Sequence, residues 1–123
     1  MAVILIVEDE VFTRETAKLI VEDLGHSTFS AHDIDEALLL LRSPQHIDAL
    51  FTDIRFKTAV QGGFELSHQA VKLRPKLRVL YATGNSITDK MTALFVEGAR
   101  FLQKPYTQNQ LEDSMEELLA APF

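Results

Sequence analysis

The chain has 123 residues, of which 46% are hydrophobic and 24% charged, a length and composition typical of one globular domain. It contains no cysteine, which excludes a disulfide scaffold, a thiolate metal site and cysteine catalysis. Twelve Lys and Arg against eighteen Asp and Glu give a net charge of −6, which would repel a nucleic-acid backbone, so we expect no nucleic-acid partner.

The apolar segments are too short to cross a membrane. The longest unbroken apolar run, residues 2–7, falls far short of the ~20 residues of a membrane-spanning helix. No Lys or Arg precedes it, and Glu8-Asp9-Glu10 follows it instead of a small-residue cleavage site, so the run does not have the pattern of a signal peptide. We therefore expect a cytoplasmic protein with no membrane partner.

The first half of the chain alternates strand-like and helix-like segments. Residues 3–7 are apolar throughout and rich in β-branched side chains, as in a central parallel strand covered on both faces. Residues 11–24 have helical periodicity, and Gly25 suits the end of that helix. Residues 27–31 form a weaker strand candidate, and residues 33–42 predict a second helix.

The alternation continues into the second half. Residues 49–52 predict a third strand that ends at Asp53. A loop then leads to Gly62-Gly63, where the periodicity of a third helix begins. Residues 77–82 predict a fourth strand with apolar residues at most positions.

Two capping patterns mark the last two helices. Ser86-Ile87-Thr88-Asp89 has capping-box-like spacing before a helix that should end at Gly98. Residues 101–103 predict a short fifth strand. Thr107 and Gln110 form a second capping box, which should open the final helix.

Five βα units with short connections predict one α/β domain over residues 1–123, with a parallel sheet and helices on both faces. Periodicity alone leaves the strand order open. The natural order for five such units is the flavodoxin-like (βα)5 doubly wound arrangement 2-1-3-4-5. Ligands of such folds bind at the carboxyl ends of the strands.

Polar residues follow four of the predicted strands, and these strands are neighbours in that order. They are Glu8-Asp9, Asp53, Thr83 and Lys104. Clustered carboxylates repel each other unless a cation neutralises them, and hard oxygen ligands favour Mg²⁺. A carboxylate can then act as a nucleophile toward a phosphoryl group whose charge the Lys and Thr stabilise. A single Asp at the end of a strand is more often a helix cap than a nucleophile. The occurrence of all these polar residues at one edge of the sheet favours a phosphoryl-accepting site.

At these residues the chain resembles the response-regulator receiver domains of two-component signalling, over essentially its whole length. The resemblance implies a flavodoxin-like fold with Asp53 as the phosphoacceptor. It also implies bound Mg²⁺, held by Asp53, by Asp9 directly, by Glu8 through water and by the backbone carbonyl of Arg55. The matching stretches are Ile4-Leu5-Ile6-Val7-Glu8-Asp9-Glu10, Thr52-Asp53-Ile54, Gly63-Phe64-Glu65-Leu66, Ala82-Thr83-Gly84 and Phe101-Leu102-Gln103-Lys104-Pro105-Tyr106.

By the same resemblance, Thr83 and Lys104 contact the phosphoryl oxygens, and the Lys104–Pro105 bond is cis. Thr83 and Phe101 form a switch pair, although Phe101 stands where the family often has Tyr; an ordinary strand residue is the alternative. The partners implied are a histidine kinase or histidine phosphotransfer protein as donor and an unknown downstream protein. We expect a stand-alone receiver that catalyses only its own phosphorylation and dephosphorylation and acts through protein contacts or as a phosphate sink. A receiver excised from a larger kinase is the alternative.

One stretch departs from the family pattern. Between Asp53 and Gly63 the loop is two residues longer than in most members and lacks their Met-Pro pair, so the rigidity of this loop is an open question. Arg55 precedes the change, and metal binding should survive it.

Two other functions fit parts of the sequence. A phosphatase of the haloacid-dehalogenase type would need Asp-x-Asp after the first strand, where the chain has Glu8-Asp9-Glu10. A phosphorylation-independent interaction module would have lost functional residues from its pocket. Here all five polar positions at the strand ends still have side chains suited to binding a metal or a phosphoryl group. The four histidines have no metal-ligand spacing and are expected at the surface, and no Gly-rich nucleotide-binding loop is present.

Overall fold

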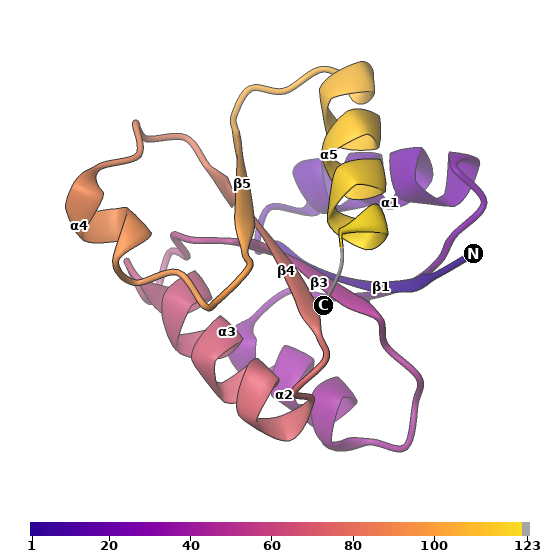
Figure 1. The fold of residues 1–123 in the computed structure, drawn as a ribbon, viewed down its shortest axis with the longest axis horizontal. Coiled ribbons are helices and arrows are strands. Elements are labelled where there is room, and N and C mark those ends of the chain that lie inside the picture. The colour runs from indigo at the N-terminus through magenta and orange to yellow at the C-terminus, as the bar shows by residue number, and fades with distance from the viewer. Residues whose placement is uncertain (122–123) are drawn as a thin grey trace.

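The structure of the chain, a computed structural model, describes residues 1–121. Strands and helices alternate along the whole sequence, as the periodicity predicts (Figure 1). In chain order the elements are β1 (Val3–Val7), α1 (Val11–Asp23), β2 (Ser27–Ala31), α2 (Ile34–Arg42), β3 (Ala49–Asp53), α3 (Gly62–Leu73), β4 (Arg78–Thr83), α4 (Asp89–Thr92), β5 (Arg100–Gln103) and α5 (Gln108–Ala120).

The five strands form one parallel sheet in the order β2-β1-β3-β4-β5. This confirms the predicted flavodoxin-like fold and its strand order. In Figure 1, α1 and α5 lie on one face of the sheet and α2 and α3 on the other. The carboxyl ends of β1, β3, β4 and β5 therefore meet along a single edge, as parallel neighbours must.

The sheet separates two apolar cores. Successive strand residues point to opposite faces, so Ile4 and Ile6 of β1 pack with side chains of α1 and α5, whereas Leu5 and Val7 pack with those of α2 and α3. All four are at most 1% exposed. Burying such a side chain contributes about 1.5–3 kcal/mol, which fixes the register of β1 and places the next residue, Glu8, at the sheet edge.

Several predicted helix ends are confirmed. Leu24 caps α1, and Gly25 follows with a φ of 93°, a left-handed conformation that glycine adopts without strain. Thr107 and Gln110 form the reciprocal hydrogen bonds of a capping box at the start of α5.

The prediction for the fourth helix is wrong. Instead of extending from the Ser86 region to Gly98, α4 is a single turn, and its N-cap is Thr88 rather than Ser86. Beyond α4 the backbone N–H of Val96 donates to the Tyr81 hydroxyl at 3.2 Å instead of continuing the helical hydrogen bonds. That bond occupies a donor that a longer helix would need for its own backbone.

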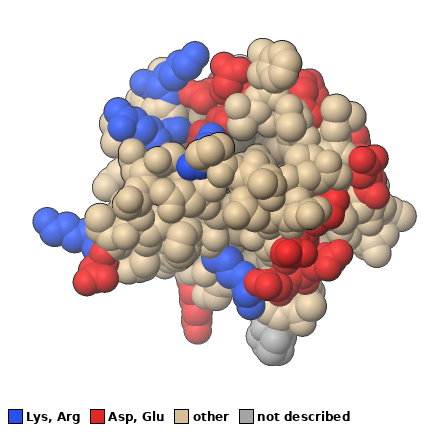
Figure 2. All heavy atoms as spheres, turned by 90° about the horizontal axis from the view of Figure 1, so that it is seen from above, with Lys and Arg blue, Asp and Glu red and all other residues tan. Residues whose placement is uncertain are grey.

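Charge is unevenly spread over the surface. On the face seen in Figure 2, acidic side chains gather toward the right and Lys and Arg mostly toward the left, so this face has no continuous basic surface. Within residues 1–121, no helix combines the length and the apolar character that crossing a membrane requires.

Candidate functional site

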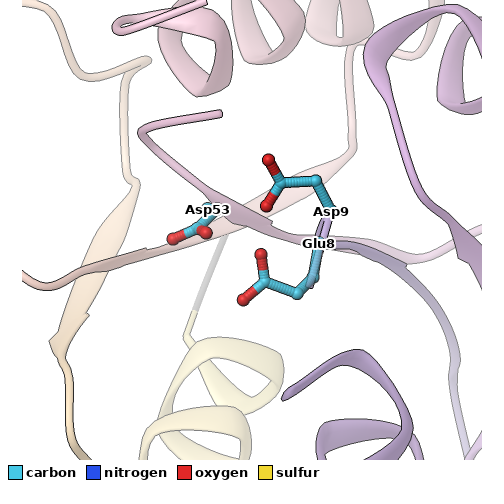
Figure 3. Close-up of side chains that lie close together, drawn as sticks. All are labelled: Glu8, Asp9 and Asp53. Atoms are coloured by element: carbon cyan, nitrogen blue, oxygen red, sulfur yellow. The ribbon is translucent and has the colours of Figure 1, made fainter. Parts of the chain in front are cut away.

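A cluster of carboxylates lies where β1 and β3 end. Val7 pairs with Thr52 in the sheet register, so Glu8 and Asp53, the next residues of each chain segment, lie at the same edge. One carboxylate oxygen from each of Glu8, Asp9 and Asp53 lies within 4.8 Å of the others (Figure 3). Among the described residues, this is the group of acidic and histidine side chains close enough to hold a metal ion.

Lys104 reaches into this cluster from the end of β5. Its backbone N–H donates to the carbonyl of Thr83 at 2.7 Å, which ties it to the neighbouring strand β4. Its Nζ donates to Glu8 Oε1 at 2.7 Å and to Asp53 Oδ2 at 3.0 Å. The Lys104–Pro105 peptide bond is cis, as expected. A residue distant in sequence thus supplies the positive charge between two carboxylates.

The electrostatics of the cluster favour a further cation. Burial, reinforced by neighbouring Glu8, raises the pKa of Asp53 to about 7, and Lys104 offsets only part of this increase. Burial alone would lower the pKa of Lys104, but the two carboxylates outweigh it and leave that pKa above its ordinary value. One ammonium therefore does not balance three nearby carboxylates.

Glu8 supplies an independent sign that the site is built to hold a cation. Its side chain is 7% exposed, and its Oε2 is buried without a hydrogen-bond partner among the described residues. A buried carboxylate oxygen without a partner is costly. Hard oxygen donors in this arrangement fit Mg²⁺, which retains water and takes one or two carboxylates.

Thr83 lies at the end of β4, beside the cluster, and is buried. Its hydroxyl accepts the N–H of Asn85 at 3.1 Å and contacts the Asn85 carbonyl at 3.4 Å. In this structure, then, the hydroxyl is bound to its own loop. Arg55 is exposed in the loop after β3, and the role of its carbonyl stays a prediction.

Phe101 does not join the cluster. It pairs with Tyr81 in the register of β4 and β5, is 44% exposed, and contacts the ring of Phe95 with centroids 6.1 Å apart. The ring therefore lies outward, rather than in the core position expected of an ordinary strand residue. Its role as a switch stays a prediction.

Several contacts at the site could not be found from sequence patterns. The backbone N–H of Lys57 donates to Asp9 Oδ2 at 2.8 Å, and Arg14 donates to the carbonyl of Glu8 at 2.9 Å. Tyr106 lines a small cavity next to Glu8 and Lys104, and burial raises the pKa of its phenol. Two of these contacts use backbone atoms, which every residue possesses, so residue types gave no signal for them.

The histidines lie away from this site. His32, His46 and His68 are exposed, as expected. His26 differs: it is half-buried, its Nδ1 accepts the N–H of Ala2 at 2.9 Å, and burial lowers its pKa. His26 thus binds the backbone just before β1, at the edge of the sheet opposite to the carboxylate cluster.

Comparisons with known proteins identify close relatives in sequence and structure. The chain is 30% identical over 113 residues to the sensory transduction protein LytR of Streptococcus agalactiae, an alignment that covers 89% of this chain and 44% of LytR. The chain thus spans less than half the length of that curated relative.

Solved receiver structures match over nearly their full length. A response regulator receiver protein from Sinorhizobium medicae is 26% identical with a TM-score of 0.87, covering 98% of this chain and 95% of that one. The non-phosphorylated HemR receiver domain from Leptospira biflexa is 25% identical with a TM-score of 0.84, covering 100% and 98%. The sequence model of the response regulator receiver domain matches residues 4–116. The chain belongs to the response regulator receiver domain family of two-component signalling.

Proposed function

We propose that this receiver accepts a phosphoryl group on Asp53 from a phosphohistidine donor and signals through the resulting change in its surface. The observation that carries the proposal is the position of Lys104, whose Nζ bridges Asp53 and Glu8 at 3.0 and 2.7 Å. A largely buried carboxylate beside a fixed ammonium and two further carboxylates is a suitable acceptor for a phosphoryl group.

Each step of the transfer can be assigned to this chain's residues. An oxygen of the ionised Asp53 carboxylate attacks phosphorus, the P–N bond to the donor imidazole breaks, and the imidazole nitrogen retains the electron pair and takes up a proton. Asp53 becomes an acyl phosphate. Lys104 already contacts Asp53 Oδ2 and stabilises charge on the phosphoryl oxygens. Water later attacks the phosphorus of the acyl phosphate, the P–O bond to Asp53 breaks, and inorganic phosphate leaves as the carboxylate is restored.

The carboxylates of Glu8, Asp9 and Asp53, with the carbonyl of Arg55, would hold Mg²⁺. When bound, the ion supplies positive charge that offsets the carboxylates and the phosphoryl oxygens. The partnerless Glu8 Oε2 and the raised pKa of Asp53 both support this assignment.

Signal output rests on Thr83 and Phe101. To reach a phosphoryl oxygen, the Thr83 hydroxyl must leave Asn85, its present partner. That movement vacates space into which the exposed Phe101 ring can turn, and burying the ring contributes about 2 kcal/mol. Two packings separated by a few kcal/mol form a switch that a charge change can bias.

The donor class is a histidine kinase or histidine phosphotransfer protein, and the output is a protein contact, phosphate relay or phosphate sink. Membership in the receiver family supports a role between a kinase and a downstream protein. The name of LytR, a sensory transduction protein, is consistent with this role.

Intact-mass spectrometry with acetyl phosphate and Mg²⁺ tests the proposal. We expect one added phosphoryl group on wild type, none on Asp53→Asn, and none when EDTA removes the metal. No added mass on wild type would favour a phosphorylation-independent interaction module. Steady turnover of external phosphoesters would instead indicate a phosphatase.

A further inference from the structure

The long loop between β3 and α3, residues 54–61, is packed rather than loose. Phe56 is 3% exposed and exchanges two backbone hydrogen bonds with Ala59, at 3.0 and 3.2 Å, which close a tight turn. Gly62 leaves room for this packing, because a Cβ there would lie 2.8 Å from the Phe56 ring. Gly63 donates to the Ile54 carbonyl at 2.8 Å. The loop is therefore held at both ends and by a buried ring.

This packed turn presents one backbone donor to the acidic cluster. Lys57 follows the buried Phe56 directly, and its N–H donates to Asp9 Oδ2 at 2.8 Å across 48 positions of sequence. A hydrogen bond to a carboxylate is charge-assisted and stronger than a neutral one. In Figure 3 one oxygen of Asp9 points toward Glu8 and Asp53, so the carboxylate faces the cluster while the loop holds it.

We infer that the Lys57 backbone N–H is a positioning group that orients Asp9 toward the cation site, so that the extended loop sets the affinity for Mg²⁺. The inference rests on the proposed function, in which Asp9 holds the metal. Groups that orient metal ligands without touching the metal typically change affinity 10- to 100-fold when removed. Phe56 contributes indirectly, because its burial fixes the turn from which Lys57 donates.

The turn allows this donor to be deleted selectively. Phe56 and Ala59 are its first and fourth residues, so Lys57 is the second. Among the described residues only glycines have positive φ, so the hydrogen-bonded turn fits type I, whose second residue has a φ near −60°, the value that proline adopts. Proline is favoured at the second position of such turns and has no N–H. Lys57→Pro therefore suits the turn and removes the bond to Asp9.

The test is a Mg²⁺ titration of wild type, Lys57→Pro and the matched control Lys57→Ala, followed by amide NMR shifts of residues around Asp53. The control loses the same exposed side chain but keeps the N–H. We expect the Kd for Mg²⁺ to rise at least about 10-fold in Lys57→Pro and to stay within about twofold of wild type in Lys57→Ala. Phosphorylation of Lys57→Pro by acetyl phosphate should recover when Mg²⁺ is raised, which a general folding defect would not permit.

Equal Mg²⁺ affinity in all three proteins, or equal weakening in both variants, overturns the inference and leaves the proposed function standing. Failure of wild type to bind Mg²⁺ near Asp53 overturns both. If Lys57→Pro does not fold, amide hydrogen exchange of wild type decides instead. Lys57 N–H should exchange more slowly in wild type than in Asp9→Ala, and equal rates contradict the inference.

Discussion

Replacing Asp53 by Asn should stabilise the protein when no metal is bound. Burial and the Glu8 carboxylate raise the pKa of Asp53 from 3.8 to about 7. Each pKa unit corresponds to about 1.4 kcal/mol, so ionising Asp53 costs roughly 4 kcal/mol more in the folded protein than in the unfolded chain. The Asn amide has the same size and carries no charge, so this cost disappears.

The sign of the pH dependence follows from proton binding. Between about pH 4 and pH 7 the folded protein retains the Asp53 proton and the unfolded chain has lost it, so the stability of wild type falls as pH rises through this window. The variant lacks this titration. The pKa of about 7 already includes the opposing effect of Lys104, so the expected gain above pH 7 is roughly 4 kcal/mol.

Urea unfolding of wild type and Asp53→Asn, at about pH 5 and about pH 8 with EDTA or with Mg²⁺, measures this difference. We expect the variant to be more stable at the higher pH in EDTA, with a smaller advantage at the lower pH. Mg²⁺ should raise the stability of wild type more than that of the variant, because a ligand stabilises the state that binds it. The reasoning would be refuted if the variant were less stable than wild type in EDTA. It would also be refuted if the stability difference between the two proteins were the same at both pH values and with or without Mg²⁺.

Three further predictions address the metal, the switch and the fold. Asp9→Ala should weaken Mg²⁺ binding severely and Glu8→Ala less, because Glu8 is expected to act through water. Equal and negligible effects of the two substitutions in a Mg²⁺ titration would show that the metal binds elsewhere. Thr83→Ala should still be phosphorylated. Beryllofluoride, a phosphoryl mimic, should nevertheless cause smaller NMR shifts along β5 in this variant than in wild type, and equally large shifts would contradict the proposed switch. Tyr81→Phe leaves the buried Val96 N–H without its partner and should cost about 1–3 kcal/mol of unfolding free energy. Unchanged stability in urea unfolding would show that this hydrogen bond does not stabilise the fold.

Much of the fold could be predicted because the strands carry strong local signals. Residues 3–7 form a strand with the predicted bounds, since an apolar, β-branched run between short connections fits few other structures. The weaker candidate, residues 27–31, also forms a strand with the predicted bounds and pairs with this one. The α4 region could not be predicted in the same way. The sequence there has helical periodicity, but the N–H of Val96 donates a hydrogen bond to the Tyr81 side chain of β4. A hydrogen bond between segments distant in sequence leaves no local pattern.

The positions of the site residues were predictable for a related reason. Side chains that follow parallel strands meet at one edge, so Glu8, Asp9, Asp53 and Lys104 lie together. The loop that carries Lys57 could not be predicted, because its order depends on the burial of Phe56 and on backbone hydrogen bonds. The missing proline left the rigidity of this loop open, and the structure shows a packed turn.

Borohydride trapping tests the central claim most directly. Borohydride reduces the acyl phosphate of an aspartate to the alcohol of homoserine, and peptide mass mapping then locates the altered residue. After incubation with acetyl phosphate and Mg²⁺, we predict homoserine at position 53 and at no other aspartate, with none formed when EDTA replaces Mg²⁺. Homoserine at another position, or none in a folded, Mg²⁺-loaded protein, would contradict the assignment of Asp53 as the phosphoacceptor.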